Sequence, residues 1–186
     1  NYPAFRAGTR TSPIDRGNLN RLFPGRPDGT VTEKIAHYFD SVLLTLADLV
    51  LDIHSGGRTL DFLPFAAVHV LDDKTQQTRC EAAMAAFGAP YSMLLRELDS
   101  KGMYDSAAED KGKVFVSTEL GGGGTGRAST VAIARRGIRD VLRHAGILAG
   151  EIEPRDSVRL TMPGDDCFIL SEASGMVEPC IDLGGR

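Results

Sequence analysis

Short apolar runs alternate with amphipathic segments along this chain, and that alternation constrains the fold more than any other feature of the sequence. Runs with the length and composition of buried strands lie at residues 48–53, 65–71, 91–95 and 114–120. Apolar residues spaced at three and four positions predict helices over 30–46, 72–87 and 129–144. This order predicts an α/β protein whose sheet is flanked by helices, with functional side chains at the carboxyl ends of strands.

The expected helices begin and end at residues with suitable capping chemistry. Thr30 or Thr32 can cap the first helix with its side-chain oxygen. Gly88 and Pro90 follow the second helix, and Gly146 follows the third, as glycine and proline do where helices stop. These signals support the helix boundaries independently of the hydrophobic pattern.

The two ends of the chain differ from its middle. Residues 1–30 are rich in Pro, Gly, Asn and Arg and are expected to form an ordered loop. Beyond Gly150, the short β-prone pieces are 158–161, 167–170 and 176–177. We therefore divide the chain into a core over 1–150 and the start of a small β domain over 151–186.

Composition argues against several classes of partner. The formal net charge of −4 and the aromatic content of 6% provide no basic, stacking surface for nucleic acid. The apolar stretches are far shorter than the roughly 20 residues that span a bilayer, so no membrane is expected. Cys80, Cys167 and Cys180 show no CxxC spacing, which argues against a disulfide framework or a thiolate zinc site and favours the cytoplasm.

His54 and Glu119 have the best placement for catalysis. His54 follows an apolar run, where an imidazole oriented by its neighbours can bind zinc, or can simply be a hydrogen-bonded histidine at a strand end. Glu119 ends another apolar run, where a carboxylate can shuttle protons or pair with an arginine. Surface positions on a helix or strand are expected for His37, His69 and His144.

Arg10 and Arg21 lie in the turn-rich first segment, and Asn20 precedes Arg21. Two guanidinium groups with an amide beside them can bind a carboxylate, which would suit an acidic or zwitterionic substrate. Alternatively, the arginines pair with Asp15 or Asp28 and only staple the loop.

Several of these signals occur together and in an order typical of one family. They are NYPA at 1–4, TR at 9–10, NLNRLF at 18–23, LDIHS at 51–55 and TELG at 118–121. With these motifs the chain resembles the succinylglutamate desuccinylase/aspartoacylase family, which is related to the zinc carboxypeptidases. The resemblance implies a zinc-dependent amidohydrolase with a carboxypeptidase-like mixed sheet flanked by helices, and the opening of a C-terminal β domain.

The resemblance also implies a role for each candidate residue. His54 would be the third zinc ligand, and Glu119 would be the general base that activates the attacking water. Arg10 would polarise the scissile carbonyl. The substrate carboxylate would be held by Asn20 and Arg21.

The metal site implied by the resemblance is expected to be incomplete in this sequence. Gly56 and Gly57 would shape the pocket beside the metal, and one zinc is expected per complete chain. The other zinc ligands of the family come from an upstream HGxE-type motif, which this sequence lacks. A catalytic zinc normally has three protein ligands plus water. Because the chain also starts without an initiator Met, we expect upstream sequence to be missing, weak or no zinc binding, and no activity of this polypeptide alone.

The implied reaction is hydrolysis of the amide bond of a small N-acyl amino acid. The stretches at 9–15, 51–57 and 86–91 favour N-alpha-acetyl-L-2,4-diaminobutyrate, an intermediate of ectoine breakdown, as the substrate. The alternatives are another substrate, such as N-succinylglutamate or N-acetylaspartate, a non-catalytic carboxylate-binding domain, or an ordered remnant of a longer polypeptide. A homo-oligomer is a further open expectation.

Overall fold

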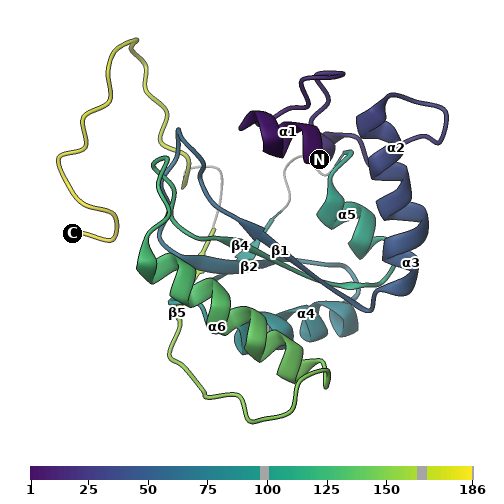
Figure 1. Ribbon diagram of the computed structural model, residues 1–186. Coiled ribbons are helices and arrows are strands. Elements are labelled where there is room, and N and C mark those ends of the chain that lie inside the picture. The colour runs from purple at the N-terminus through teal and green to yellow at the C-terminus, as the bar shows by residue number, and fades with distance from the viewer. Residues whose placement is uncertain (97–100, 163–166, 186) are drawn as a thin grey trace.

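A mixed sheet of five strands forms the centre of the molecule (Figure 1). The computed structural model describes residues 1–96, 101–162 and 167–185. The strands lie in the order β1-β4-β2-β3-β5, with β1 at Leu49–His54, β4 at Val114–Glu119, β2 at Phe65–His69, β3 at Tyr91–Leu95 and β5 at Val158–Thr161. β4 runs parallel to β1 and antiparallel to β2. The mixed sheet flanked by helices confirms the expected fold class.

Helices cover both faces of this sheet (Figure 1). One face packs against α4 (Lys74–Phe87) and α6 (Ala128–His144). On the other side lie α2 (Val31–Tyr38), a π-helical stretch at Phe39–Leu43, α3 (Leu44–Leu46) and α5 (Tyr104–Glu109). In the described part of the chain, no helix is both long and apolar enough to cross a membrane.

The central strand β4 is buried on both faces, which explains its continuous apolar sequence. Val114 and Val116 point to one face and join the core formed with α4 and α6. Phe115 points to the opposite face and packs with Leu44 and Val50 against α5. We call this second face the α5 face of the sheet.

Two of the expected capping residues, Thr30 and Gly88, lie at helix ends in the structure. Thr30 accepts a hydrogen bond from the backbone of Glu33, whose side chain accepts one from the backbone of Thr30, so that a capping box begins α2. Asp73 caps α4, and Gly88 ends it in the left-handed conformation. The predicted helix over 30–46 is confirmed as a continuous helical segment, although a π-helical stretch interrupts its α-helical hydrogen bonding.

The first 30 residues are not only loop, contrary to expectation. Asn1 caps a helix, α1, at Tyr2–Ala7, and a 3-10 helix forms at Leu19–Arg21. Neither these helices nor α5 was predicted. Each has six residues or fewer, which is too short to show the periodicity that reveals longer helices.

The C-terminal segment attaches to the core through the strand β5 and through ion pairs. β5 pairs in parallel with β3, so the strand expected at 158–161 belongs to the main sheet. Arg155 and Arg143 both bind the buried carboxylate of Asp140 on α6, at 2.7 and 2.8 Å. Burial alone would raise the pKa of Asp140, but the hydrogen bonds from these arginines keep it below its usual value.

The other strand pieces expected near the C-terminus do not form. Residues 167–170 and 176–177 are not strands, and Ile169 and Met176 are almost fully exposed. The proposed division of the chain at residue 150 stays a prediction.

Helices α4 and α6 approach closely at Gly137, and this contact generates a stability prediction. A Cβ atom at this position would overlap the ring of Phe87, which is fully buried. Overpacking typically costs about 1–3 kcal/mol, against about 1 kcal/mol gained when Ala replaces Gly in a helix. We therefore expect Gly137→Ala to lower the free energy of unfolding, measured with denaturant. Adding Phe87→Leu should recover part of that loss, and a stabilised single variant would contradict the close contact.

Candidate active site

The carboxyl ends of β1 and β4 bring the two main candidates together. The strands are parallel, and their register pairs Asp52 with Ser117 and His54 with Glu119. Residues two apart share one face of a strand, so Asp52 and His54 project to the same side as Glu119, which is the α5 face of the sheet. We call Asp52, His54 and Glu119 the strand-end cluster.

The imidazole of His54 is held in one orientation by Asp52. His54 Nε2 lies 2.9 Å from Asp52 Oδ2, and because a carboxylate only accepts, Nε2 carries the donated hydrogen. His54 Nδ1 then has a free lone pair in the neutral ring and lies 3.9 Å from Glu119 Oε1. This is the arrangement expected of a metal-binding histidine whose other nitrogen is bonded to a carboxylate.

The electrostatics of the cluster favour the protonated forms of both His54 and Glu119. The hydrogen bond to Asp52 raises the pKa of His54 against the opposing effect of burial, and the charges of Asp52, Glu119 and Asp105 raise it further. Burial raises the pKa of Glu119, the charge of Asp52 adds to this, and His54 opposes it. A carboxylate with a raised pKa is better suited to accept and return a proton near neutral pH.

One oxygen of Glu119 is left without a partner. Its Oε2 atom is buried and has no hydrogen bond within the described part of the chain. An unsatisfied buried acceptor is costly, and such atoms in native proteins often have a catalytic role or bind a ligand. The Glu119–arginine pair considered as an alternative is not found among the described residues.

Asn20 and Arg21 lie on the 3-10 helix Leu19–Arg21. Asn20 Oδ1 accepts a hydrogen bond of 2.7 Å from the backbone N–H of Tyr104, the first residue of α5. The Arg21 guanidinium is exposed and donates to the carbonyl oxygen of Asn20. The pair is therefore tied to α5, which covers the face that carries His54 and Glu119.

Arg10 is exposed and makes no ion pair with Glu119 or any other described residue. The alternative prediction, that Arg10 and Arg21 pair with Asp15 or Asp28 within the loop, is wrong for both arginines. Asp15 instead accepts hydrogen bonds from the backbone and hydroxyl of Thr32, and Asp28 pairs with a different arginine, Arg26. Neither Arg10 nor Arg21 therefore forms an ion pair with Asp15 or Asp28.

Comparison with known proteins decides the family. The succinylglutamate desuccinylase/aspartoacylase catalytic domain matches residues 1–145. The chain belongs to this family. N-alpha-acetyl-L-2,4-diaminobutyric acid deacetylase of Halomonas elongata is 54% identical over 186 residues, which are 99% of this chain and 54% of that protein.

Two solved structures superpose closely on the chain. The product-bound ectoine utilization protein EutE of Ruegeria pomeroyi is 66% identical with a TM-score of 0.94, covering 98% of this chain and 56% of that one. A succinylglutamate desuccinylase/aspartoacylase of Rhodobacter sphaeroides is 35% identical with a TM-score of 0.88, covering 96% and 55%. The chain thus spans about half the length of these relatives.

The strand-end cluster fits one part of the zinc site implied by this family. When the His54 ring is neutral, its Nδ1 has a lone pair for a metal, and the neighbouring Glu119 has a buried oxygen, Oε2, without a hydrogen-bond partner among the described residues. Within residues 1–96, 101–162 and 167–185, no three His, Cys, Asp or Glu side chains are placed to hold a metal together. Among these residues, His54 is the side chain whose geometry suits a metal ligand, and the carboxylate of Glu119 lies beside it.

Two residues near the cluster were missed by the sequence analysis. Asp105 is buried, accepts hydrogen bonds from the backbone and hydroxyl of Ser106, and contributes its charge to His54. Tyr104 has a pKa raised by burial and by the charge of Asp52. Both begin the short helix α5, and no sequence motif marks it.

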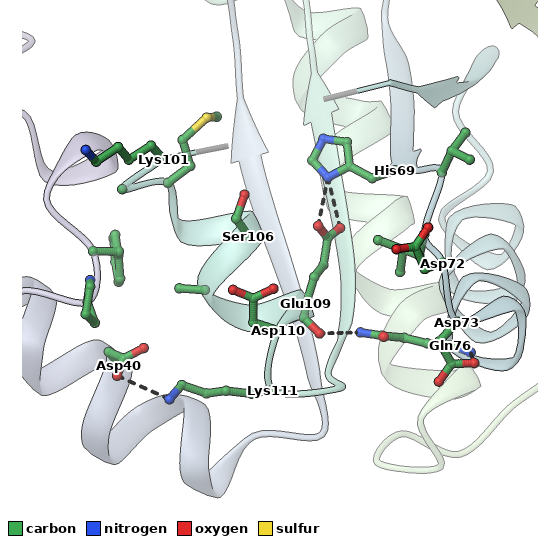
Figure 2. Close-up of a pocket in the computed structure, with 17 residues that line it drawn as sticks. Asp40, His69, Asp72, Asp73, Gln76, Lys101, Ser106, Glu109, Asp110 and Lys111 are labelled. Carbon is green, nitrogen blue, oxygen red and sulfur yellow. Dashed lines mark hydrogen bonds and ion pairs between the residues drawn. The ribbon is translucent and has the colours of Figure 1, made fainter. Parts of the chain in front are cut away.

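A large cavity lies elsewhere on the α5 face, near the start of β4. It has a volume of about 1010 Å³ and does not include His54 or Glu119. Figure 2 shows His69 on its wall, with Nδ1 bonded to the carboxylate of Glu109 at 2.9 and 3.0 Å. The expected surface position of His69 is wrong, because α5 buries it. This cavity therefore lies apart from the strand-end cluster.

Gly56 and Gly57 lie where two loops come into close contact. The loop after β1 and the loop after β4 share three backbone hydrogen bonds, from Gly56 to Gly121, Gly123 to Leu60, and Gly124 to Gly57. A Cβ at Gly56 would overlap the carbonyl of Leu60, and Gly57 has φ of 63°. The glycines thus join the loops beside the strand-end cluster, and their role in shaping a substrate pocket stays a prediction.

The same loop contact predicts the effect of a glycine substitution. A Cβ at Gly122 would overlap the carbonyl oxygen of Leu60, whereas a Cβ at Gly126 meets no atom within 4 Å. Gly122→Ala should therefore destabilise the protein by roughly 1–3 kcal/mol, the usual cost of overpacking. Gly126→Ala is the matched control and should leave the unfolding midpoint nearly unchanged. Equal midpoints for the two variants would show that the loops are not in firm contact.

Proposed function

We propose that this chain is the part of a zinc-dependent amidohydrolase that carries one metal ligand and the general base. The observation that carries the proposal is the pairing of His54 with Glu119 at adjacent strand ends, with one buried oxygen of Glu119 unpartnered. Family membership supports the same reading. The proposed substrate is N-alpha-acetyl-L-2,4-diaminobutyrate, since a relative 54% identical is named as its deacetylase and another is an ectoine utilization protein.

His54 would provide one of the protein ligands of the zinc. Asp52 orients the ring of His54 by accepting a hydrogen bond from Nε2. His54 Nδ1 then faces Glu119. When bound, zinc supplies a Lewis acid for the amide carbonyl and lowers the pKa of water to about 7. The remaining ligands are proposed to lie in the part of the relatives that this chain does not span.

Glu119 would move the protons of the reaction. It takes one from the attacking water and later delivers it to the nitrogen of the leaving amine, so that the carboxylate is regenerated. Its raised pKa, caused mainly by burial, suits both steps. The unpartnered Oε2 atom has no competing hydrogen bond to break first within the described chain.

The cationic and amide groups of the first segment would bind the substrate. Arg10 would stabilise the negative charge that develops on the scissile carbonyl oxygen. Asn20 and Arg21 would hold the carboxylate of the amino acid. Because neither Arg10 nor Arg21 is paired with an acidic residue in the described structure, both remain available for these contacts.

The role of Glu119 is tested by replacing it with glutamine in a polypeptide of the length of the relatives. Glu119→Gln keeps the shape but cannot accept the proton, so kcat should fall by at least about 10²–10⁴-fold. Zinc per chain, measured by elemental analysis, should stay the same, whereas His54→Ala should lose it. Glu151→Gln, at an exposed position, is the matched control. Substantial residual turnover in Glu119→Gln would remove Glu119 as the base.

A further inference from the structure

A short segment before α5 holds the 3-10 helix that carries Asn20 and Arg21. The carbonyl oxygen of Gly102 accepts a hydrogen bond of 3.0 Å from the backbone of Phe23. The backbone N–H of Tyr104 donates to Asn20 Oδ1 at 2.7 Å. Residues 102–104 therefore hydrogen-bond to Asn20 and to Phe23, on either side of Arg21, although Asn20 and Tyr104 lie 84 positions apart in the sequence.

Gly102 permits this close approach. Its φ is 77°, and a Cβ atom would lie only 2.6 Å from the carbonyl oxygen of Arg21. Any larger residue would have to push the Arg21 backbone away or distort the segment. The 3-10 helix and the segment before α5 can therefore lie this close only because Gly102 has no side chain.

The contact with Tyr104 also determines which way the Asn20 amide points. A side-chain amide has one oxygen that accepts and one nitrogen that donates. The partner is a backbone N–H, which can only donate, so the oxygen must face Tyr104. The two N–H groups of Asn20 Nδ2 donate to no acceptor in the described part of the chain.

The ring of Tyr104 connects this arrangement to the sheet. It stacks on Phe23 with ring centres 4.9 Å apart and meets the edge of Phe115 at 5.6 Å. Phe115 is buried on β4, the strand that ends at Glu119. The packed rings of Tyr104 and Phe115 therefore fix the position of the Asn20 amide relative to β4, the strand that carries the proposed base.

We propose that Gly102 and Tyr104 are positioning residues, which orient the Asn20 amide so that its N–H groups, together with Arg21, bind the carboxylate of the substrate. This inference rests on the proposed function, which supplies the carboxylate-bearing substrate. Gly102 acts by its lack of a side chain and Tyr104 through its backbone N–H and its ring. Neither residue is required to contact the substrate.

The test compares two ligands in a polypeptide that includes this chain and has the length of its relatives. The ligands are N-alpha-acetyl-L-2,4-diaminobutyrate and its carboxamide, which lacks the carboxylate. Binding is measured by calorimetry in the Glu119→Gln background, where hydrolysis does not intervene, and KM and kcat are measured with Glu119 restored. The parent should prefer the acid over the amide.

Gly102→Ala should weaken binding of the acid by roughly 10–100-fold, the usual effect of losing hydrogen bonds to a charged group. The amide should be affected much less, and KM should rise with little change in kcat. Gly112→Ala is the matched control, because Gly112 has a similar φ of 70° but no atom within 4 Å of its Cβ position. It carries the same backbone strain without the collision, so its ligand preference should equal that of the parent.

Asn20→Asp provides a second and independent variant. Its carboxylate can still accept the hydrogen bond from Tyr104, so the unfolding temperature should stay close to that of the parent. It has no N–H groups and repels the substrate carboxylate, so preference for the acid should be lost. Unchanged preference in either Gly102→Ala or Asn20→Asp, or a parent that does not distinguish acid from amide, would overturn the inference. Absence of zinc-dependent turnover would instead contradict the proposed function, while the binding comparison would still hold.

Discussion

The parallel pairing of β1 with β4 is the interaction on which the candidate site depends. Each strand carries a functional residue at its carboxyl end, and the backbone ladder brings His54 level with Glu119. A slip of one residue in this register would turn the side chains of a strand to its other face. The 3.9 Å separation of His54 Nδ1 and Glu119 Oε1 is therefore a consequence of backbone pairing, and Asp52 then orients the imidazole within it.

Burial of the sheet on both faces maintains that pairing. Val114 and Val116 pack toward α4 and α6, and Phe115 packs toward α5. The same burial raises the pKa of Glu119, because the charged carboxylate is poorly solvated there. Thus one packing arrangement stabilises the fold and also gives Glu119 the proton affinity that its proposed role requires.

Local patterns predicted the larger elements well and the smaller ones poorly. β3 was expected at 91–95 and lies at Tyr91–Leu95, and α6 was expected to end near His144, where it does. The short helices α1 and α5 escaped prediction because isolated helices of this length are unstable and depend on tertiary contacts. His69 was placed on the surface for a related reason, since its partner Glu109 lies 40 positions away on one of those helices.

The sequence by itself determined the alternation of strands and helices, their capping residues, and the identity of the candidate groups, because these depend on short-range periodicity and on side-chain chemistry. Only the tertiary structure decided which groups meet. It showed that Asp52 orients His54, that Asp15 binds Thr32 and neither Arg10 nor Arg21, and that Tyr104 orients Asn20. These contacts join residues whose separation along the chain ranges from 2 to 84 positions. The contacts of Asp15 and Asn20 depend on how segments distant in the sequence pack together, which no local pattern contains.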